Sequence, residues 1–160
     1  MVSNMKSKKI EIRTLEGVLR SYSLGFPEST EEFPWGERAI KVRNKTFVFM
    51  RAELGEFSIS VKLPKSKDLA LTLPFTEPTH YGLGKSGWVT AQFTVGVEPP
   101  LEMLKAWVDE SYRTIAPKKL VAQLDSLAEG AGSAPKSENK GKPQRGARRP
   151  KPRLKRQSKV

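Results

Sequence analysis

The first apolar positions of the chain recur at helical spacing. Between residues 8 and 24 the large apolar side chains lie three or four positions apart, as on one face of an amphipathic helix. They are Ile12, Leu15, Val18, Leu19 and Tyr22. We therefore expect a first helix that ends where the sequence GFPEST introduces glycine and proline.

Four later segments are expected to be strands, and all of them except TFVFMRA alternate apolar and polar residues, as strands do when one face is buried. They are RAIKVR (38–43), TFVFMRA (46–52), FSISVKL (57–63) and GWVTAQFTV (87–95). We expect the first two to form a hairpin with a tight turn at Asn44-Lys45. In the first segment the apolar residues share one face, which leaves Lys41 and Arg43 on the solvent face.

Helical spacing returns after the last of these strands. Apolar residues from Leu101 to Ile115 step by three and four positions, and Pro99 or Pro100 marks the helix start. Pro117 begins a last helix, which Gly130 ends, and a short helix is expected in KSKDLALTL (65–73). Strands joined by short turns and flanked by helices predict a two-layer α+β domain, with an antiparallel sheet and helices packed on one face.

The charge of the chain is concentrated at its C-terminal end. Of the net charge of +12, residues 131–160 contribute +10, from six lysines, five arginines and one acidic residue. Leu154 and Val160 are the only apolar residues there larger than alanine, which is too little burial to offset the entropy of ordering. We therefore expect a folded domain over 1–130 and a disordered polybasic tail over 131–160.

Composition excludes several classes of protein. The chain has no cysteine, which removes disulfides, thiolate metal sites and cysteine nucleophiles. No segment approaches the roughly 20 apolar residues of a membrane span, and the first residues lack the apolar run of a signal peptide. We expect a cytoplasmic protein, with association with the nucleoid as one option.

The triplet Gly84-Lys85-Ser86 resembles the end of a phosphate-binding P-loop. The first glycine of that motif would fall at Thr79, and the segment that follows is a predicted strand where a P-loop requires a helix. We expect a glycine-containing turn that leads into a strand.

No set of residues predicts catalysis or metal binding. His80 is the only histidine, and Ser111 lacks the Gly-x-Ser-x-Gly pattern of a nucleophile elbow. The acidic pairs 31–32 and 109–110 are neighbours in sequence, so their side chains point apart, and we expect the second pair on the solvent face of a helix. We expect no enzyme, no cofactor and no metal.

The predicted domain also carries side chains of the kinds that contact nucleic acids. Basic residues that can face a polyanion are Lys41, Arg43, Lys45, Lys62, Lys65, Lys67 and Lys85. Of the tryptophans, which can stack on bases, we expect Trp107 in or beside the core and Trp35 and Trp88 packed against turns.

Five segments together resemble the MmcQ/YjbR family of small bacterial proteins, in order and in spacing. They are EEFPWGERAIKV, KTFVFM, SVKL, HYGLGKSGWV and DESYRTIAPKKL, within residues 10–125. The residues that carry the resemblance are Pro34, Trp35, Gly36, Lys45, Phe47, His80, Lys85, Gly87, Trp88, Val89, Ser111 and Tyr112. The glycine-containing stretch before Lys85 is longer than the family pattern, and the tail has no counterpart in it.

The resemblance implies a two-layer fold similar to secretion chaperones or frataxin, and a protein usually described as DNA-binding. It also implies that Gly87 and Trp88 form a turn before the last strand. Our leading hypothesis is a non-enzymatic, largely sequence-independent DNA-binding protein, with a monomer favoured. The alternative is a protein-interaction or small-ligand module whose tail only localises it, and a polybasic tail does not distinguish DNA from RNA. The candidate contacts are Lys41, Arg43, Lys45, Lys62, Lys85, Arg145, Arg148, Arg149, Lys151, Arg153, Lys155 and Arg156.

Overall fold

A single antiparallel sheet of six strands, in the order β1-β2-β3-β4-β6-β5, organises the computed structural model, which describes residues 12–130. The elements are α1 (Ile12–Leu24), β1 (Ser29–Glu32), η1 (Pro34–Gly36), β2 (Arg38–Val42), β3 (Lys45–Glu53), β4 (Glu56–Lys62), α2 (Lys67–Ala70), β5 (Thr76–Pro78), η2 (Leu83–Ser86), β6 (Trp88–Thr94), α3 (Leu101–Ile115) and α4 (Lys118–Gly130). The predicted tail 131–160 lies outside the described residues, as do residues 1–11.

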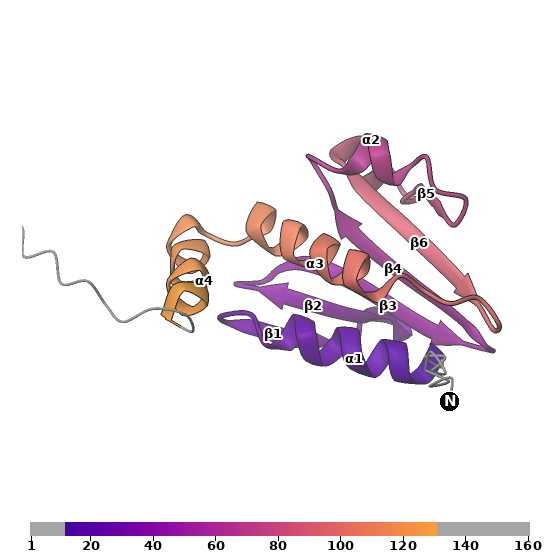
Figure 1. Ribbon diagram of the computed structural model, residues 1–160, viewed down its shortest axis with the longest axis horizontal. Helices are drawn as coiled ribbons and strands as arrows, with labels where there is room; N and C mark the ends of the chain where they lie inside the picture. The colour runs from indigo at the N-terminus through magenta and orange to yellow at the C-terminus, as the bar shows by residue number, and fades with distance from the viewer. Residues whose placement is uncertain (1–11, 131–160) are drawn as a thin grey trace, which may run out of the picture.

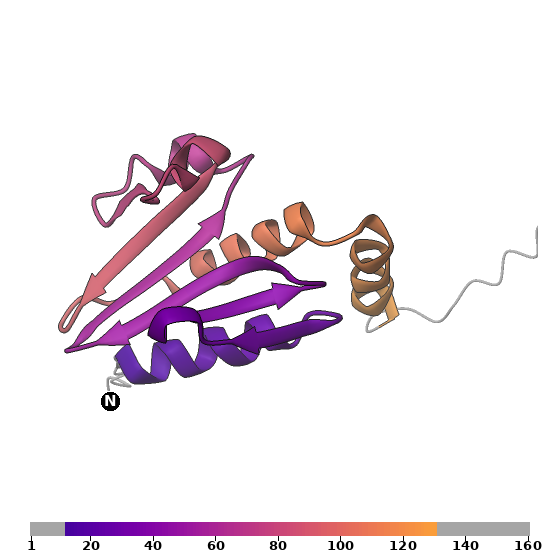
Figure 2. The same ribbon diagram turned by 180° about the vertical axis from the view of Figure 1, so that it is seen from behind.

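Helices α1 and α3 pack against one face of the sheet (Figures 1 and 2). The opposite face carries mostly polar side chains. In β4 the alternation is complete, since Phe57, Ile59 and Val61 are buried and the serines between them face the other way. The register of β4 with β3 and β6 places apolar partners opposite each of these three residues. This confirms the predicted α+β class and the single helical layer.

The helices bury the apolar stripes that their spacing predicts. Leu15 and Leu19 of α1 are fully buried, as are Leu104, Val108 and Tyr112 of α3. At 25–30 cal/mol per Å² of apolar surface removed from water, side chains of this size each contribute roughly 1.5–3 kcal/mol. Burial of these two stripes therefore holds the helices on the sheet.

Ion pairs add a polar connection between α1 and the first two strands. Glu31 of β1 accepts hydrogen bonds from Arg20 of α1 and from Arg38 of β2, both at 2.6 Å. Arg38 also contacts Glu16 of α1 at 3.2 Å. Because these groups are only half buried, the network orients β1 more than it stabilises the domain.

The structure corrects three details of the expected fold. The edge strands β1 and β5 were not predicted, and α2 is only four residues long. The β2–β3 turn lies at Arg43 and Asn44, whose φ angles of 45° and 65° suit the left-handed residues of a two-residue hairpin turn. Lys45 therefore begins β3, and Arg43 belongs to the turn rather than to a strand face.

Candidate nucleic-acid interface

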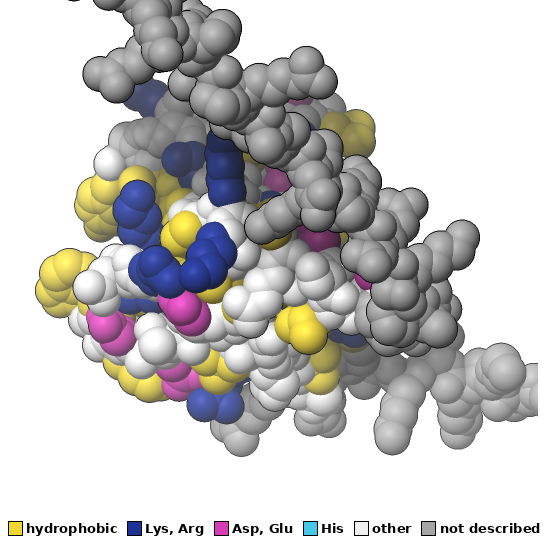
Figure 3. Space-filling model, turned by 90° about the vertical axis from the view of Figure 1, so that its left-hand side faces the viewer, with side chains coloured by type: hydrophobic (Ala, Val, Ile, Leu, Met, Phe, Trp, Pro, Cys, Tyr) yellow, Lys and Arg dark blue, Asp and Glu magenta, His cyan; other side chains and the backbone are white. Residues whose placement is uncertain are grey.

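Lysines gather at one end of the sheet, where the β2–β3 turn, the end of β4 and the start of β6 lie. We call this the basic end, and its lysines are Lys45, Lys62, Lys65, Lys67, Lys85, Lys118 and Lys119. None of them is in the ion pairs that the described residues form with one another. Figure 3 faces this end and shows basic side chains gathered there, with carboxylates among them.

Ser111 of α3 fixes the end of β4 beneath the basic end. Its Oγ accepts a hydrogen bond from the backbone N–H of Lys62 at 2.9 Å and donates one to the carbonyl of Phe47 at 2.5 Å. Phe47 lies at the register shift between β2 and β3, so it has no pairing partner in β2. Ser111, one of the residues that carry the family resemblance, therefore connects α3 to β3 and β4 through hydrogen bonds.

Glu110 holds the loop that carries Lys65. Its carboxylate accepts hydrogen bonds from the backbone N–H groups of Lys65 and Ser66, at 2.8 and 3.0 Å, and from the Ser66 hydroxyl at 2.5 Å. The expectation that the acidic pair 109–110 is only a solvent face was wrong for Glu110. The Glu110 carboxylate thus holds the loop after β4 in place. The ammonium groups of the lysines in this loop remain available to an anion.

The glycine-containing segment before β6 is a tight turn, as predicted, and not a P-loop. It forms the 3-10 helix η2 and leads directly into a strand. Gly87 has a φ of 90°, which favours glycine, and Trp88 is buried beside it, with its ring 5.6 Å from that of Phe49. Lys85 is exposed at the end of this turn.

We expect Gly84→Ala to destabilise the protein by about 1–3 kcal/mol, because an added Cβ would overpack the turn. That Cβ would lie 2.8 Å from the Cβ of Pro78 and 3.1 Å from the carbonyl oxygen of Thr79. The matched control is Gly17→Ala in α1, where nothing lies within 4 Å and alanine should stabilise by roughly 0.5–1 kcal/mol. Urea unfolding measures both, and equal stability of Gly84→Ala and wild type would contradict the tight turn.

Two of the predicted contact residues are engaged by carboxylates. Arg43 donates hydrogen bonds to both oxygens of Glu28, at 2.6 and 3.1 Å, and Lys41 forms an ion pair with Glu32. The hydrogen bonds from Arg43 lower the pKa of Glu28, and the charge of Lys119 lowers it further. These pairs cancel much of the field of Lys41 and Arg43, so Lys45, Lys62 and Lys85 are the stronger candidates for phosphate contacts.

The remaining predicted contacts lie outside the described residues. They are Arg145, Arg148, Arg149, Lys151, Arg153, Lys155 and Arg156. The described chain ends with α4 (Figure 1). The first turn of this helix carries two lysines of the basic end.

Trp88 and Trp107 lie where the sequence predicts them, at a turn and in the core, whereas Trp35 does not. Trp88 and Trp107 are each 6% exposed and cannot stack on a base, whereas Trp35 is 98% exposed and packs against no turn. Tyr81, which the sequence analysis did not single out, is fully exposed beside η2. Exposure of a single aromatic residue in a loop leaves no periodic signal in a sequence, so only the structure could reveal it.

The opposite end of the sheet exposes large apolar side chains among charged ones. The connections β1–β2, β3–β4 and β6–α3 meet there and expose large side chains. We call this the apolar end, and its residues are Phe33, Trp35, Leu54, Val95 and Val97. Pro34, Trp35 and Gly36 form η1 at this end, so this part of the family motif lies far from the lysines.

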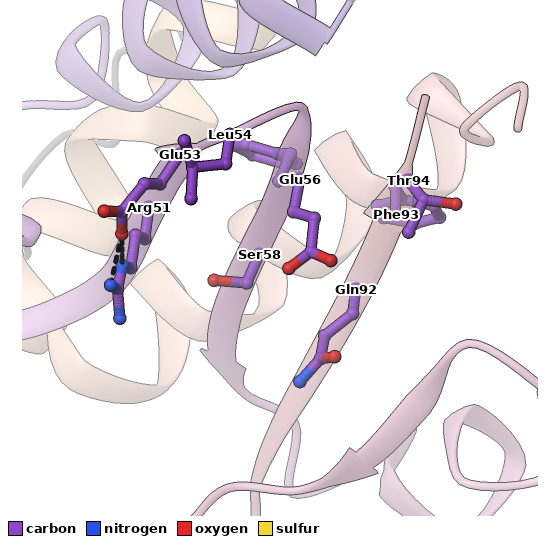
Figure 4. A pocket seen from close by; sticks show the side chains of 9 residues that line it. Arg51, Glu53, Leu54, Glu56, Ser58, Gln92, Phe93 and Thr94 are labelled. Carbon is purple, nitrogen blue, oxygen red and sulfur yellow. Dashed lines mark hydrogen bonds and ion pairs between the residues drawn. The ribbon is translucent and has the colours of Figure 1, made fainter. Parts of the chain in front are cut away.

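A hollow of about 510 Å³ lies over the polar face of the sheet beside the apolar end. Arg51 and Glu53 bind each other on one side of it, and Glu56, Ser58 and Gln92 line the rest (Figure 4). The volume is in the range of small-molecule pockets, but most of the lining side chains are exposed. This hollow therefore cannot enclose most of a ligand.

The described domain shows no candidate metal site. Residues 12–130 contain no cluster of three or more His, Asp or Glu side chains with metal-ligand geometry. His80 is largely exposed, with its Nε2 3.3 Å from Glu77. Among the helices of that range, none is long and apolar enough to cross a membrane.

Comparisons with known proteins agree with the fold. The YjbR family model matches residues 24–114, more than half of the chain, and confirms the resemblance to the MmcQ/YjbR family. A crystal structure of a Deinococcus radiodurans protein with a DUF419 domain is similar, with 22% sequence identity and a TM-score of 0.56. The alignment covers 73% of this chain and 90% of that one, and at this identity it shows the fold alone. No curated protein matches the chain.

Proposed function

Because this chain belongs to the YjbR family, we propose that it is a non-enzymatic DNA-binding protein whose contacts are largely independent of sequence. The observation that carries the proposal is the basic end, where seven lysines are free of ion pairs with described residues. Most other basic side chains of residues 12–130 are engaged by carboxylates, so the positive field is concentrated at this end.

The physical basis of binding is the release of counterions. Each lysine or arginine that neutralises a phosphate frees condensed cations from the DNA, and this gain requires no particular base sequence. A lysine ammonium on a flexible stem acts as a point charge rather than as a reader of base edges. RNA offers the same phosphates, so binding assays must include both polymers.

The tail, residues 131–160, carries further positive charge. The described chain ends with α4, which starts beside the basic end, and residues 131–160 add eleven basic residues and one acidic residue. Of the complete net charge of +12, the segment 131–160 supplies +10. In this proposal the basic end orients the DNA and the tail provides most of the affinity.

The apolar end supports the alternative function, a protein-interaction or small-ligand module. Trp35 and Leu54 are 98% and 97% exposed there, next to the hollow over the sheet. Under this alternative the lysines only form a solvated surface. Replacing them with neutral residues would then leave the binding of the partner or ligand unchanged. The two functions therefore differ in the effect of removing charge at the basic end.

The test is neutralisation of two free lysines in the full chain. We expect Lys62→Gln combined with Lys85→Gln to weaken binding to a labelled DNA duplex of mixed sequence. The slope of log affinity against log salt should become shallower by about 2, because each phosphate contact contributes close to 1. Fluorescence anisotropy over roughly 50–200 mM salt measures this slope.

The matched control removes an ion pair and keeps the net charge. Lys41→Gln combined with Glu32→Gln eliminates one base and its carboxylate partner, so affinity and slope should match those of wild type. If the two double variants behave alike, the contacts are not at the basic end. If wild type shows no affinity for DNA or RNA at low salt, the proposed function is wrong.

A further inference from the structure

Tyr81 is a fully exposed aromatic residue with no role in the packing of the domain. Its ring takes part in none of the aromatic or cation–π contacts among the described residues, and its hydroxyl makes no hydrogen bond with them. Tyr22 and Tyr112, in contrast, both pack against other rings. An exposed aromatic ring with no internal contact is available to a ligand.

The backbone holds Tyr81 in an unfavourable conformation. Its φ is 59°, a left-handed value that residues other than glycine and asparagine seldom adopt. The surrounding turn is closed by hydrogen bonds from the N–H of Gly84 to the carbonyl of Thr79, at 3.0 Å, and from the N–H of Leu83 to that of His80, at 3.3 Å. The hydroxyl of Thr79 also bonds that of Thr90 on β6, at 2.9 Å. The ring is therefore presented from a fixed turn.

This turn lies beside the free lysines. The N–H of Thr79 bonds the carbonyl of Trp88, and Trp88 is the register partner of Lys62, so these three residues follow one another across the sheet. Lys85 is four positions after Tyr81 in the same segment. The carboxylate nearest to Tyr81 in sequence, that of Glu77, is engaged by Gln92 at 2.7 Å and by His80 at 3.3 Å.

We propose that Tyr81 stacks on an unpaired nucleobase while Lys62 and Lys85 contact the flanking phosphates, so that the basic end prefers single-stranded nucleic acid. The combination of an exposed aromatic ring and a positively charged surface is how proteins bind single strands without reading their sequence. A duplex hides the faces of its bases and offers only phosphates to the same surface. This inference rests on the proposed function, which it narrows to a class of nucleic acid.

The test compares three ligands of equal phosphate number: a single-stranded oligonucleotide, a duplex of half its length, and an abasic strand as long as the oligonucleotide. The full chain carries Tyr81→Asn, which removes the ring and keeps a residue that tolerates a positive φ, or Tyr81→Phe, which keeps the ring. We expect Tyr81→Asn to lower affinity for the single strand roughly five- to hundredfold, the usual loss for one base–aromatic stack. Affinity for the duplex and for the abasic strand should change by less than about twofold, and Tyr81→Phe should resemble wild type.

Trp35 supplies the matched control. It is equally exposed and also has a positive φ, of 52°, but it lies at the apolar end beside Glu16, Glu37 and Glu53. Trp35→Asn should leave all three affinities unchanged. If Tyr81→Asn has no effect on the single strand, or weakens all three ligands equally, stacking by Tyr81 is wrong. If wild type binds none of the three, the proposed function itself fails.

Discussion

Removal of residues 131–160 should make DNA binding far less sensitive to salt. We assume that about six of the eleven basic residues in this segment reach phosphates at once, because its prolines and its spacing prevent full alignment. At about 0.9 per phosphate neutralised, they contribute about −5 to the slope of log affinity against log salt. Two lysines at the basic end add about −2, so the full chain should show a slope near −7 and residues 1–130 a slope near −2.

Between roughly 50 and 200 mM salt, these slopes correspond to a loss of affinity of about ten-thousandfold for the full chain and about tenfold for the shortened one. A salt titration of both proteins on the same duplex measures the difference. The control is a full-length protein with residues 131–160 scrambled, which should keep the slope, because phosphate contacts position a protein but do not specify a sequence. Equal slopes with and without the segment would assign all binding to the domain.

Tyr112→Ala should destabilise the domain by about 3–5 kcal/mol, the usual cost of truncating a buried aromatic residue. Tyr112 is fully buried in α3 and packs on Phe26, with ring centroids 4.5 Å apart, and on Phe47, at 5.2 Å. It therefore connects the helical layer to β3 and to the loop after α1. Because few contacts can shift to fill the space of a whole ring, most of the cavity should remain.

The control for this variant is Tyr112→Phe, which keeps the ring and removes one hydrogen bond. The hydroxyl donates to the carbonyl of Pro27 at 2.9 Å, and burial raises the pKa of the phenol. We expect a loss of about 1 kcal/mol for this change. Urea unfolding of the full chain measures both variants. A cost below about 1 kcal/mol for Tyr112→Ala would mean that the aromatic cluster does not hold the layers together.

The central strands and the long helices were predictable from the sequence because their signals are local. In β4 every second residue is apolar, and α3 repeats its apolar residues every three or four positions. Burial on one face imposes these two periods directly on the amino-acid order. The antiparallel arrangement followed, since connections of a few residues cannot join parallel strands.

The edge strands escaped prediction because they lack such a signal. β1 reads STEE and β5 reads TEP, so neither offers an apolar alternation. They become strands because β2 and β6 present free backbone groups beside them. The position of the hairpin turn was likewise set by the register of two strands and not by the turn residues alone.

The composition of the candidate interface was partly visible in the sequence. The excess of basic residues, their number in the segment 131–160 and the absence of a catalytic motif are all properties of the order of residues. The sequence did not show which of these charged side chains form ion pairs. Arg43 and Glu28 are fifteen positions apart, and the pairing of β1 with β2 brings them to 2.6 Å.

The sequence by itself therefore determined the fold class, the helical layer, the turn before β6 and the uneven distribution of charge, because each of these depends on neighbours along the chain. The tertiary structure decided which lysines remain unpaired, which tryptophan is exposed, and that Glu110 and Ser111 of α3 fasten the loop and the strand end at the basic end. Those outcomes depend on contacts between residues far apart in sequence. Such contacts form only when the sheet and its helices pack, so no local pattern encodes them.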